Sequence, residues 1–192
     1  MKKQKKENKA AEDIAAKTTE WEEVEGFEFE PKDIDAEARD RSCCFTGHRS
    51  LSMPRAEVAE KVRELIKQAI KEGYRHFING GAVGFDTIAA EQVIALRDAG
   101  QPITLEICVP CVDQDLKWSP RQKEQYKQIL VAADSISMRK HPFTKFCMKW
   151  RNELMVSKSS LVIAYYTPGK TGGTKNTIKM AERLKMAVLY VK

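Results

Sequence analysis

The sequence contains no long hydrophobic run. No apolar stretch approaches the ~18 residues that a membrane-spanning helix requires, and the mean hydropathy of the 192 residues is −0.49. The basic residues 1–6 are not followed by an apolar stretch, so no secretory signal peptide is expected. We therefore expect a cytoplasmic protein with no membrane partner.

Cysteine and histidine are scarce, with five Cys and three His. An odd cysteine count without an export signal is typical of reduced thiols in a cytoplasm. The single C-x-x-C, from Cys108 to Cys111, has no second pair, and neither His76 nor His141 stands at a metal-ligand spacing from it. We expect no metal site and no cofactor.

Charge divides the chain into two parts. Residues 1–40 carry a net charge of −5 and no sustained apolar period, which predicts a charged, mobile N-terminal extension. Trp21, Phe27 and Phe29 are the exceptions, and they could dock onto the rest of the protein. The domain at residues 41–192 carries a net charge of +11. That charge favours anionic partners such as nucleotides or nucleic acid, although it could serve solubility alone.

From residue 41, short apolar runs alternate with amphipathic helices. Strands are predicted at 42–45, 74–79, 103–109, 135–138, 161–165 and 187–191, with a helix after each of the first five. The apolar strands are continuous, as in a sheet buried on both faces. This order predicts an α/β fold: a Rossmann-like, doubly wound, mostly parallel sheet with helices on both faces. Ligands of such folds bind beyond the carboxyl ends of the strands.

The loop after the first strand contains Thr46, Gly47, His48 and Arg49. The glycine permits a tight turn and a close approach to a ligand. An arginine can hold a phosphate through two parallel hydrogen bonds, and a histidine can donate to an oxygen or act as an acid or base. The alternative is a turn glycine followed by two solvated polar residues.

A glycine-rich loop follows the second strand and contains Gly80, Gly81 and Gly84, with Asp86 in the first turn of the next helix. Backbone N–H groups there could surround an anion at the positive end of the helix. Asp86 could cap the helix or accept a hydrogen bond from a ribose hydroxyl. The spacing is not G-x-G-x-x-G, so the usual dinucleotide motif is absent. A tight turn without a ligand is the alternative.

Two further segments carry candidate residues. Gln114 and Trp118 lie in the loop after the third strand, where the tryptophan could stack on a base or fill a gap in the core. Arg151 and Asn152 lie on the fourth predicted helix, with Arg151 on a largely apolar face. An arginine directed inward needs an anion or a carboxylate as partner, and a structural ion pair would also satisfy it.

The last glycine-rich loop, residues 169–174, superficially resembles a P-loop. A P-loop requires a glycine where this chain has Ala164, which excludes Walker-type NTP hydrolysis. Gly172, Gly173 and Thr174 still form a strand-to-helix loop that suits a phosphate, because N–H groups point outward at a helix N-terminus.

These motifs resemble the SLOG superfamily of Rossmann-like proteins, which includes the DprA/Smf DNA-processing proteins and the LOG phosphoribohydrolases. The segment at residues 44–49, the loop at 80–86 and the pair Gln114 and Trp118 resemble the YpsA/YoqJ-like group of uncharacterised bacterial and phage proteins. The resemblance covers about residues 42–190 and implies binding of a nucleotide or a nucleotide-derived ligand, by a sensor or carrier. Phosphates would be held by the glycine loops and two arginines, a ribose by Asp86 and a base by Trp118.

Two alternatives stay open within the resemblance. LOG enzymes carry M-x-x-R-K-x-x-M, which residues 148–155 match except at Asn152, and a glutamate that Thr177 replaces here. Because threonine cannot act as a carboxylate acid or base, a nucleotide phosphoribohydrolase with Arg151 as catalytic residue is disfavoured. DprA-like proteins carry a similar glycine loop and an Arg-Asn pair, so single-stranded DNA is a second possible partner.

A homo-oligomer is also possible. An acidic extension folded over the basic domain would compete with a ligand.

Overall fold

The computed structural model describes residues 2–21 and 35–192. Phe27 and Phe29, two of the aromatic residues that could dock onto the domain, lie outside this part of the chain. Trp21 lies inside it and joins the domain, since its backbone N–H donates to the carbonyl of Met138 at 3.1 Å.

The described strands form one seven-stranded sheet in which every pairing is parallel. Its order is β1-β5-β4-β3-β2-β6-β7. The strands are β1 Thr18–Glu20, β2 Ser42–Gly47, β3 His76–Asn79, β4 Thr104–Val109, β5 Ser135–Met138, β6 Leu161–Tyr165 and β7 Ala187–Tyr190. The predicted Rossmann-like parallel sheet is therefore confirmed.

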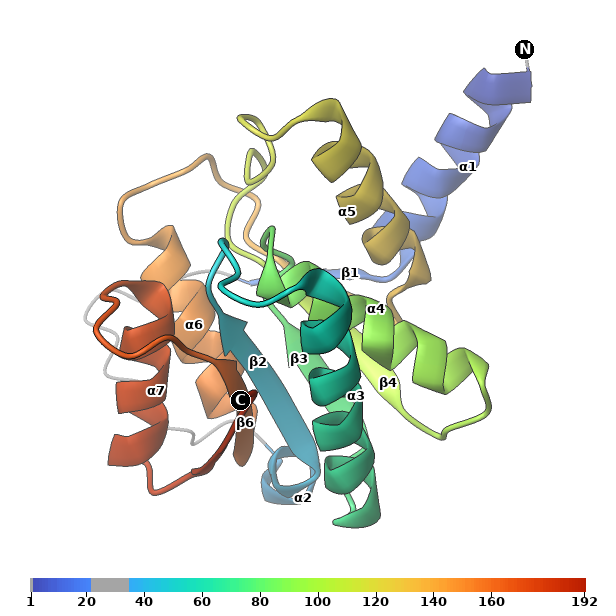
Figure 1. Ribbon diagram of the computed structural model, residues 1–192. Helices are drawn as coiled ribbons and strands as arrows, with labels where there is room; N and C mark the ends of the chain where they lie inside the picture. The colour runs from blue at the N-terminus through green and yellow to red at the C-terminus, as the bar shows by residue number, and fades with distance from the viewer. Residues whose placement is uncertain (1, 22–34) are drawn as a thin grey trace.

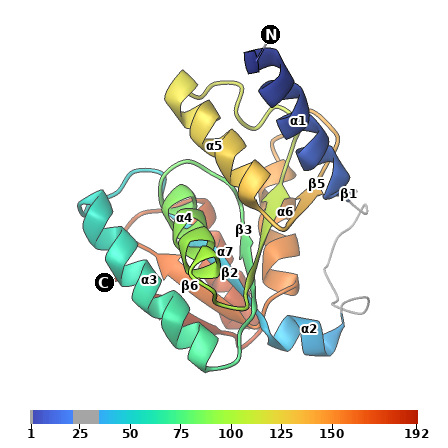
Figure 2. The same cartoon turned by 90° about the vertical axis from the view of Figure 1, so that its right-hand side faces the viewer.

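Helices cover both faces of this sheet (Figures 1 and 2). They are α1 Lys2–Ala16, α2 Ala36–Asp40, α3 Arg55–Lys71, α4 Phe85–Asp98, α5 Pro120–Ala132, α6 Cys147–Ser157 and α7 Gly173–Arg183. Among the described residues, no helix is long and apolar enough to span a membrane.

Alternate residues of the central strands enter two separate cores. Cys43 and Phe45 pack with α3, α4 and α5, whereas Cys44 packs with α6 and α7 on the other face. Because a strand directs successive side chains to opposite faces, a strand buried on both sides must be apolar throughout. This packing explains the continuous apolar runs in the sequence.

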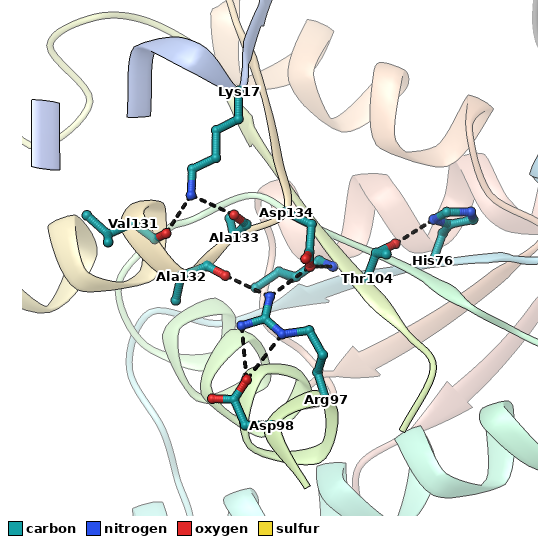
Figure 3. Close-up of polar contacts among 10 residues, drawn as sticks. Lys17, His76, Arg97, Asp98, Thr104, Val131, Ala132, Ala133 and Asp134 are labelled. Atoms are coloured by element: carbon teal, nitrogen blue, oxygen red, sulfur yellow. Dashed lines mark hydrogen bonds and ion pairs between the residues drawn. The ribbon is translucent and has the colours of Figure 1, made fainter. Parts of the chain in front are cut away.

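The N-terminal segment holds structure that the sequence analysis did not predict. Helix α1 packs on α5, and β1 pairs with β5 at the edge of the sheet. Lys17 donates to the carbonyl oxygens of Val131 and Ala133, the latter at 2.6 Å, at the carboxyl end of α5 (Figure 3). Arg97 donates to the Ala132 carbonyl at 2.7 Å beside it. Two cations thus stabilise the negative end of one helix. The mobility of residues 1–40 and a boundary at residue 41 stay predictions.

The strand order reverses direction between β2 and β6. From β2 the chain adds β3, β4 and β5 in one direction, whereas β6 and β7 lie on the other side of β2. The loops after β2 and β6 therefore diverge to opposite faces. A crevice opens at their carboxyl ends, where ligands of such folds bind.

Candidate functional site

A pocket of about 340 Å³ lies at this switch point. Small-molecule sites typically occupy about 300–1,000 Å³. The pocket is formed by the carboxyl end of β2, the loops after β2 and β3, the start of α4, the first two turns of α6 and the first turn of α7. Nine predicted site residues line it: Thr46, Gly47, His48, Arg49, Asp86, Arg151, Asn152, Gly173 and Thr174. Segments more than 120 residues apart in the sequence thus meet at one rim.

Arg151 is the buried cation of the pocket, with 7% of its surface exposed. One terminal nitrogen donates to the carbonyl of Gly80, and Nε donates to Oδ1 of Asn152 at 2.9 Å. A Cβ at position 80 would collide with this guanidinium group and would lie 2.9 Å from Oδ2 of Asp86. Glycine at position 80 therefore makes the room in which the arginine lies.

Asp86 is a buried carboxyl group at the base of the pocket. Burial raises its pKa from 3.8 to about 6, although Arg151, the N–H of Ala82 and Arg49 each favour the ionised form. The desolvation of the charge outweighs these attractions. Asp86 therefore changes its charge near pH 6, within the pocket.

The glycine loop after β3, predicted to surround an anion, uses three of its backbone donors inside the protein. The N–H of Gly81 donates to Oδ1 of Asn79 at 2.7 Å, and the N–H of Ala82 donates to Oδ2 of Asp86 at 3.3 Å. The N–H of Phe85 donates to the carbonyl of His48 at 3.2 Å. These three donors are satisfied inside the protein, so they are not directed at a ligand.

The glycines of this loop instead permit close packing. Gly81 adopts φ +63°, and a Cβ there would lie 2.9 Å from the ring of Tyr126. Gly84 adopts φ +90°, and a Cβ there would overlap the backbone of Arg49. The sequence analysis also missed Asn79, which ties the loop together by donating to the carbonyl of Asp86 at 2.8 Å. A polar residue at the end of a buried strand was the available signal.

The N-terminus of α7 does suit an anion. Gly172, at φ +119°, is the N-cap, and no described side chain caps the helix. The first N–H groups of a helix have no partner within it and carry a partial positive charge. Gly173 and Thr174 place them at the wall of the pocket, on the same side as Asn152 of α6.

His48 offers an unused polar atom to the same pocket. Its Nε2 is buried and has no hydrogen-bond partner among the described residues, while its ring lies 5.6 Å from that of Tyr166. Burial, together with the positive charge of Lys170, lowers the pKa of His48. A neutral imidazole can donate to or accept from a ligand.

Gln114 and Trp118 do not line the pocket. Gln114 supports the glycine loop from behind by donating to the carbonyl of Gly81 at 3.1 Å. Trp118 packs against the core and meets the ring of Tyr126 edge-on, with centroids 5.2 Å apart. Trp118 is half-buried against the core, and both of the roles that the sequence left open for it stay predictions.

Thr177 stands where LOG enzymes have their glutamate, and it is used internally. It is 1% exposed, and its hydroxyl donates to the carbonyl of Gly173 at 3.0 Å. Within the part of the chain that the structure describes, no group of three or more His, Cys, Asp or Glu residues is arranged for a metal ion. The carboxylate that lines the pocket is that of Asp86.

A family model matches residues 43–191 of this chain, a range that includes every residue lining the pocket. The chain belongs to the YspA SLOG family. Its relatives include the uncharacterized SPbeta prophage-derived protein YoqJ of Bacillus subtilis, 31% identical over 66% of this chain and 81% of that protein. A UPF0398 protein of Halalkalibacterium halodurans is 28% identical over 74% of this chain and 75% of that protein.

Two solved structures share the fold of this SLOG protein. DNA processing protein A from Helicobacter pylori, described with a single-stranded DNA binding mode, has a TM-score of 0.58 and 20% identity. The match covers 88% of this chain and 78% of that one. DprA from Streptococcus pneumoniae has a TM-score of 0.56 and 18% identity over 79% of this chain and 50% of that one. The resemblance to the SLOG superfamily stated from the sequence is confirmed.

Proposed function

We propose that the pocket at the carboxyl ends of β2 and β6 binds a nucleotide or a nucleotide-derived phosphorylated ligand, and that the protein is a cytoplasmic sensor or carrier. One observation carries the proposal. The exposed guanidinium group of Arg49 and the uncapped N-terminus of α7 meet at one 340 Å³ pocket, whose wall also contains the buried Arg151. Both kinds of donor are strong partners for a phosphate.

The charges in the pocket indicate where the phosphate and the ribose of the ligand would lie. An ionised Asp86 repels a phosphate, so the phosphate belongs at Gly173, Thr174 and the outer guanidinium group of Arg49. The carboxylate of Asp86 then suits a ribose hydroxyl, which donates to it. The unpaired Nε2 of His48 supports a further polar contact with the ligand. Hydrolysis of the bond between base and ribose is not proposed, because Thr177 offers no carboxylate at the position where LOG enzymes have a glutamate.

The second candidate is single-stranded DNA, favoured by the net charge of +11 on residues 41–192 and by the fold shared with DprA. Such binding depends on several phosphates at once, so its affinity must fall steeply with salt. A mononucleotide held by one phosphate pocket must lose much less affinity over the same salt range.

Isothermal titration with ribose 5-phosphate, AMP, GMP and ADP-ribose tests the proposal. Arg49 is exposed, so Arg49→Ala should fold normally and lose about tenfold or more in affinity, as expected for a charge-assisted phosphate contact. Arg55→Ala is the matched control, since Arg55 is exposed and pairs with Glu91 outside the pocket. Absence of binding by all four ligands, or equal affinities of the two variants, would contradict the proposal.

A further inference from the structure

A second and larger cavity, of about 650 Å³, lies between α6 and α7. The two helices lie side by side on one face of the sheet (Figures 1 and 2). This α6–α7 groove shares Met148, Asn152 and Gly173 with the phosphate pocket, so the two cavities adjoin along one wall. A ligand held at the N-terminus of α7 can therefore extend into the groove.

The base of a nucleotide needs a site that the phosphate pocket does not supply. Trp118, one candidate stacking partner, packs against Tyr126 and does not line that pocket. The groove offers an apolar surface instead, made by Met148, Val156, Met180 and Leu184. Methionine side chains are flexible and polarizable, and they make favourable contacts with aromatic rings.

One polar atom in the groove wall lacks a partner. Oε2 of Glu153 is buried and accepts no hydrogen bond from any described residue, while Oε1 of the same side chain lies 3.4 Å from Nζ of Lys149. A buried carboxylate oxygen without a donor is unfavourable. Glu153 lines the groove, and the terminal torsion of a glutamate side chain is broad, so its carboxylate can reorient to accept from a donor bound there.

We infer that the α6–α7 groove is the base-binding half of the site and that it selects purine nucleotides bearing an exocyclic amino group, which donates to Glu153. This inference rests on the proposed function. Adenine and guanine bases carry such an amino group, whereas the hypoxanthine of IMP does not. The cations of the groove, Lys149, Lys179 and Arg183, suit further phosphates on the same ligand.

Titration of the full chain with AMP, GMP, IMP and ribose 5-phosphate tests this inference. The wild-type protein should bind at least one of AMP and GMP about fivefold or more tightly than IMP, because a hydrogen bond to a charged acceptor is lost with the amino group. Ribose 5-phosphate should bind more weakly than either nucleotide, since it leaves the groove empty.

Glu153→Gln keeps the shape of the side chain and removes its charge. The variant should lose about fivefold in affinity for the preferred amino-purine nucleotide and leave the affinities for IMP and ribose 5-phosphate unchanged. Glu182→Gln, on the exposed face of α7 outside the groove, is the matched control and should change none of them. Thermal unfolding checks that both variants are folded.

The two proposals fail in different ways. If ribose 5-phosphate and every nucleotide fail to bind, the proposed function is wrong and the inference falls with it. If ribose 5-phosphate binds, and AMP, GMP and IMP bind equally well or Glu153→Gln binds all of them as the wild type does, only the base-binding groove is wrong. Preference for an amino-purine nucleotide, lost in Glu153→Gln, supports both.

Discussion

The buried carboxyl group of Asp86 should make the stability of the fold depend on pH in a specific direction. Its pKa is raised from 3.8 to about 6 because burial outweighs the attraction of Arg151 and Arg49. In the unfolded chain the group returns to an ordinary aspartate pKa. A tenfold change in proton affinity is about 1.4 kcal/mol, so the raised pKa corresponds to about 3 kcal/mol. This stability is fully present below pH 3.8 and is lost as the pH rises through 6.

The substitution Asp86→Asn isolates that contribution. Asparagine keeps an oxygen that accepts from the N–H of Ala82, but it does not titrate. Its fixed effect on packing is the same at every pH. Between pH 4 and pH 8, the free energy of unfolding of the variant should therefore gain about 2–3 kcal/mol relative to the wild type. Urea denaturation at intervals of half a pH unit measures both curves, and equal m-values establish that the unfolded states are comparable.

The result that would refute this reasoning is a difference between the two proteins that stays flat from pH 4 to pH 8. Such a result would mean that the two arginines fully offset the burial of the charge. A wild type that gains stability relative to the variant as the pH rises would mean that the arginines hold the carboxylate ionised. Either outcome would also remove the reason to expect a charge change in the pocket near pH 6.

Three further predictions concern the packing around this site and the N-terminal segment. Gly80→Ala should displace the guanidinium group of Arg151 and abolish nucleotide binding in calorimetry. Gly173→Ala should keep the wild-type melting temperature, because its Cβ would have only an ordinary contact of 3.5 Å with Nδ2 of Asn152. Lys17→Ala should lower the free energy of unfolding by about 0.5–1 kcal/mol through loss of the cation at the end of α5; an equal effect of Lys9→Ala, on the exposed face of α1, would contradict that role. The five cysteines are buried, so Ellman's reagent should label them slowly in the native protein and all five in urea, and rapid native labelling would contradict their burial.

The central sheet could be predicted because its strands are buried on both faces. Leu161–Tyr165 is apolar at every position and is buried at every position, so its residue types alone identify it. The strand β1 could not be predicted in the same way. Thr18–Glu20 is polar and only three residues long, and it pairs with a single neighbour at the edge of the sheet. Its position depends on backbone hydrogen bonds to β5, which leave no hydrophobic pattern in the sequence.

The candidate site was predicted in its location and only partly in its chemistry. Arg49, Arg151 and Thr174 lie in different loops and helices, and the rule that parallel strands end at one edge was enough to bring them together. The glycine loop after β3 was interpreted as an anion cradle, but Asn79 and Asp86 accept hydrogen bonds from its amides. Several glycines in one loop indicate that its backbone adopts a conformation, or a close packing, that other residues do not allow. They do not show whether the N–H groups face a ligand or the protein itself.

From residue 41 onward, the sequence by itself determined the order of strands and helices, the parallel sheet and the edge at which the loops converge. These properties follow from the spacing of apolar residues and from the order of the elements along the chain, both of which can be read directly from the sequence. The tertiary structure alone decided that Trp118 packs against Tyr126, that Gly80 makes room for Arg151, and that Glu153 has an unpaired oxygen beside a second cavity. Each of these depends on which atoms from distant segments come within a few ångströms of one another, and no local pattern in the sequence encodes that distance.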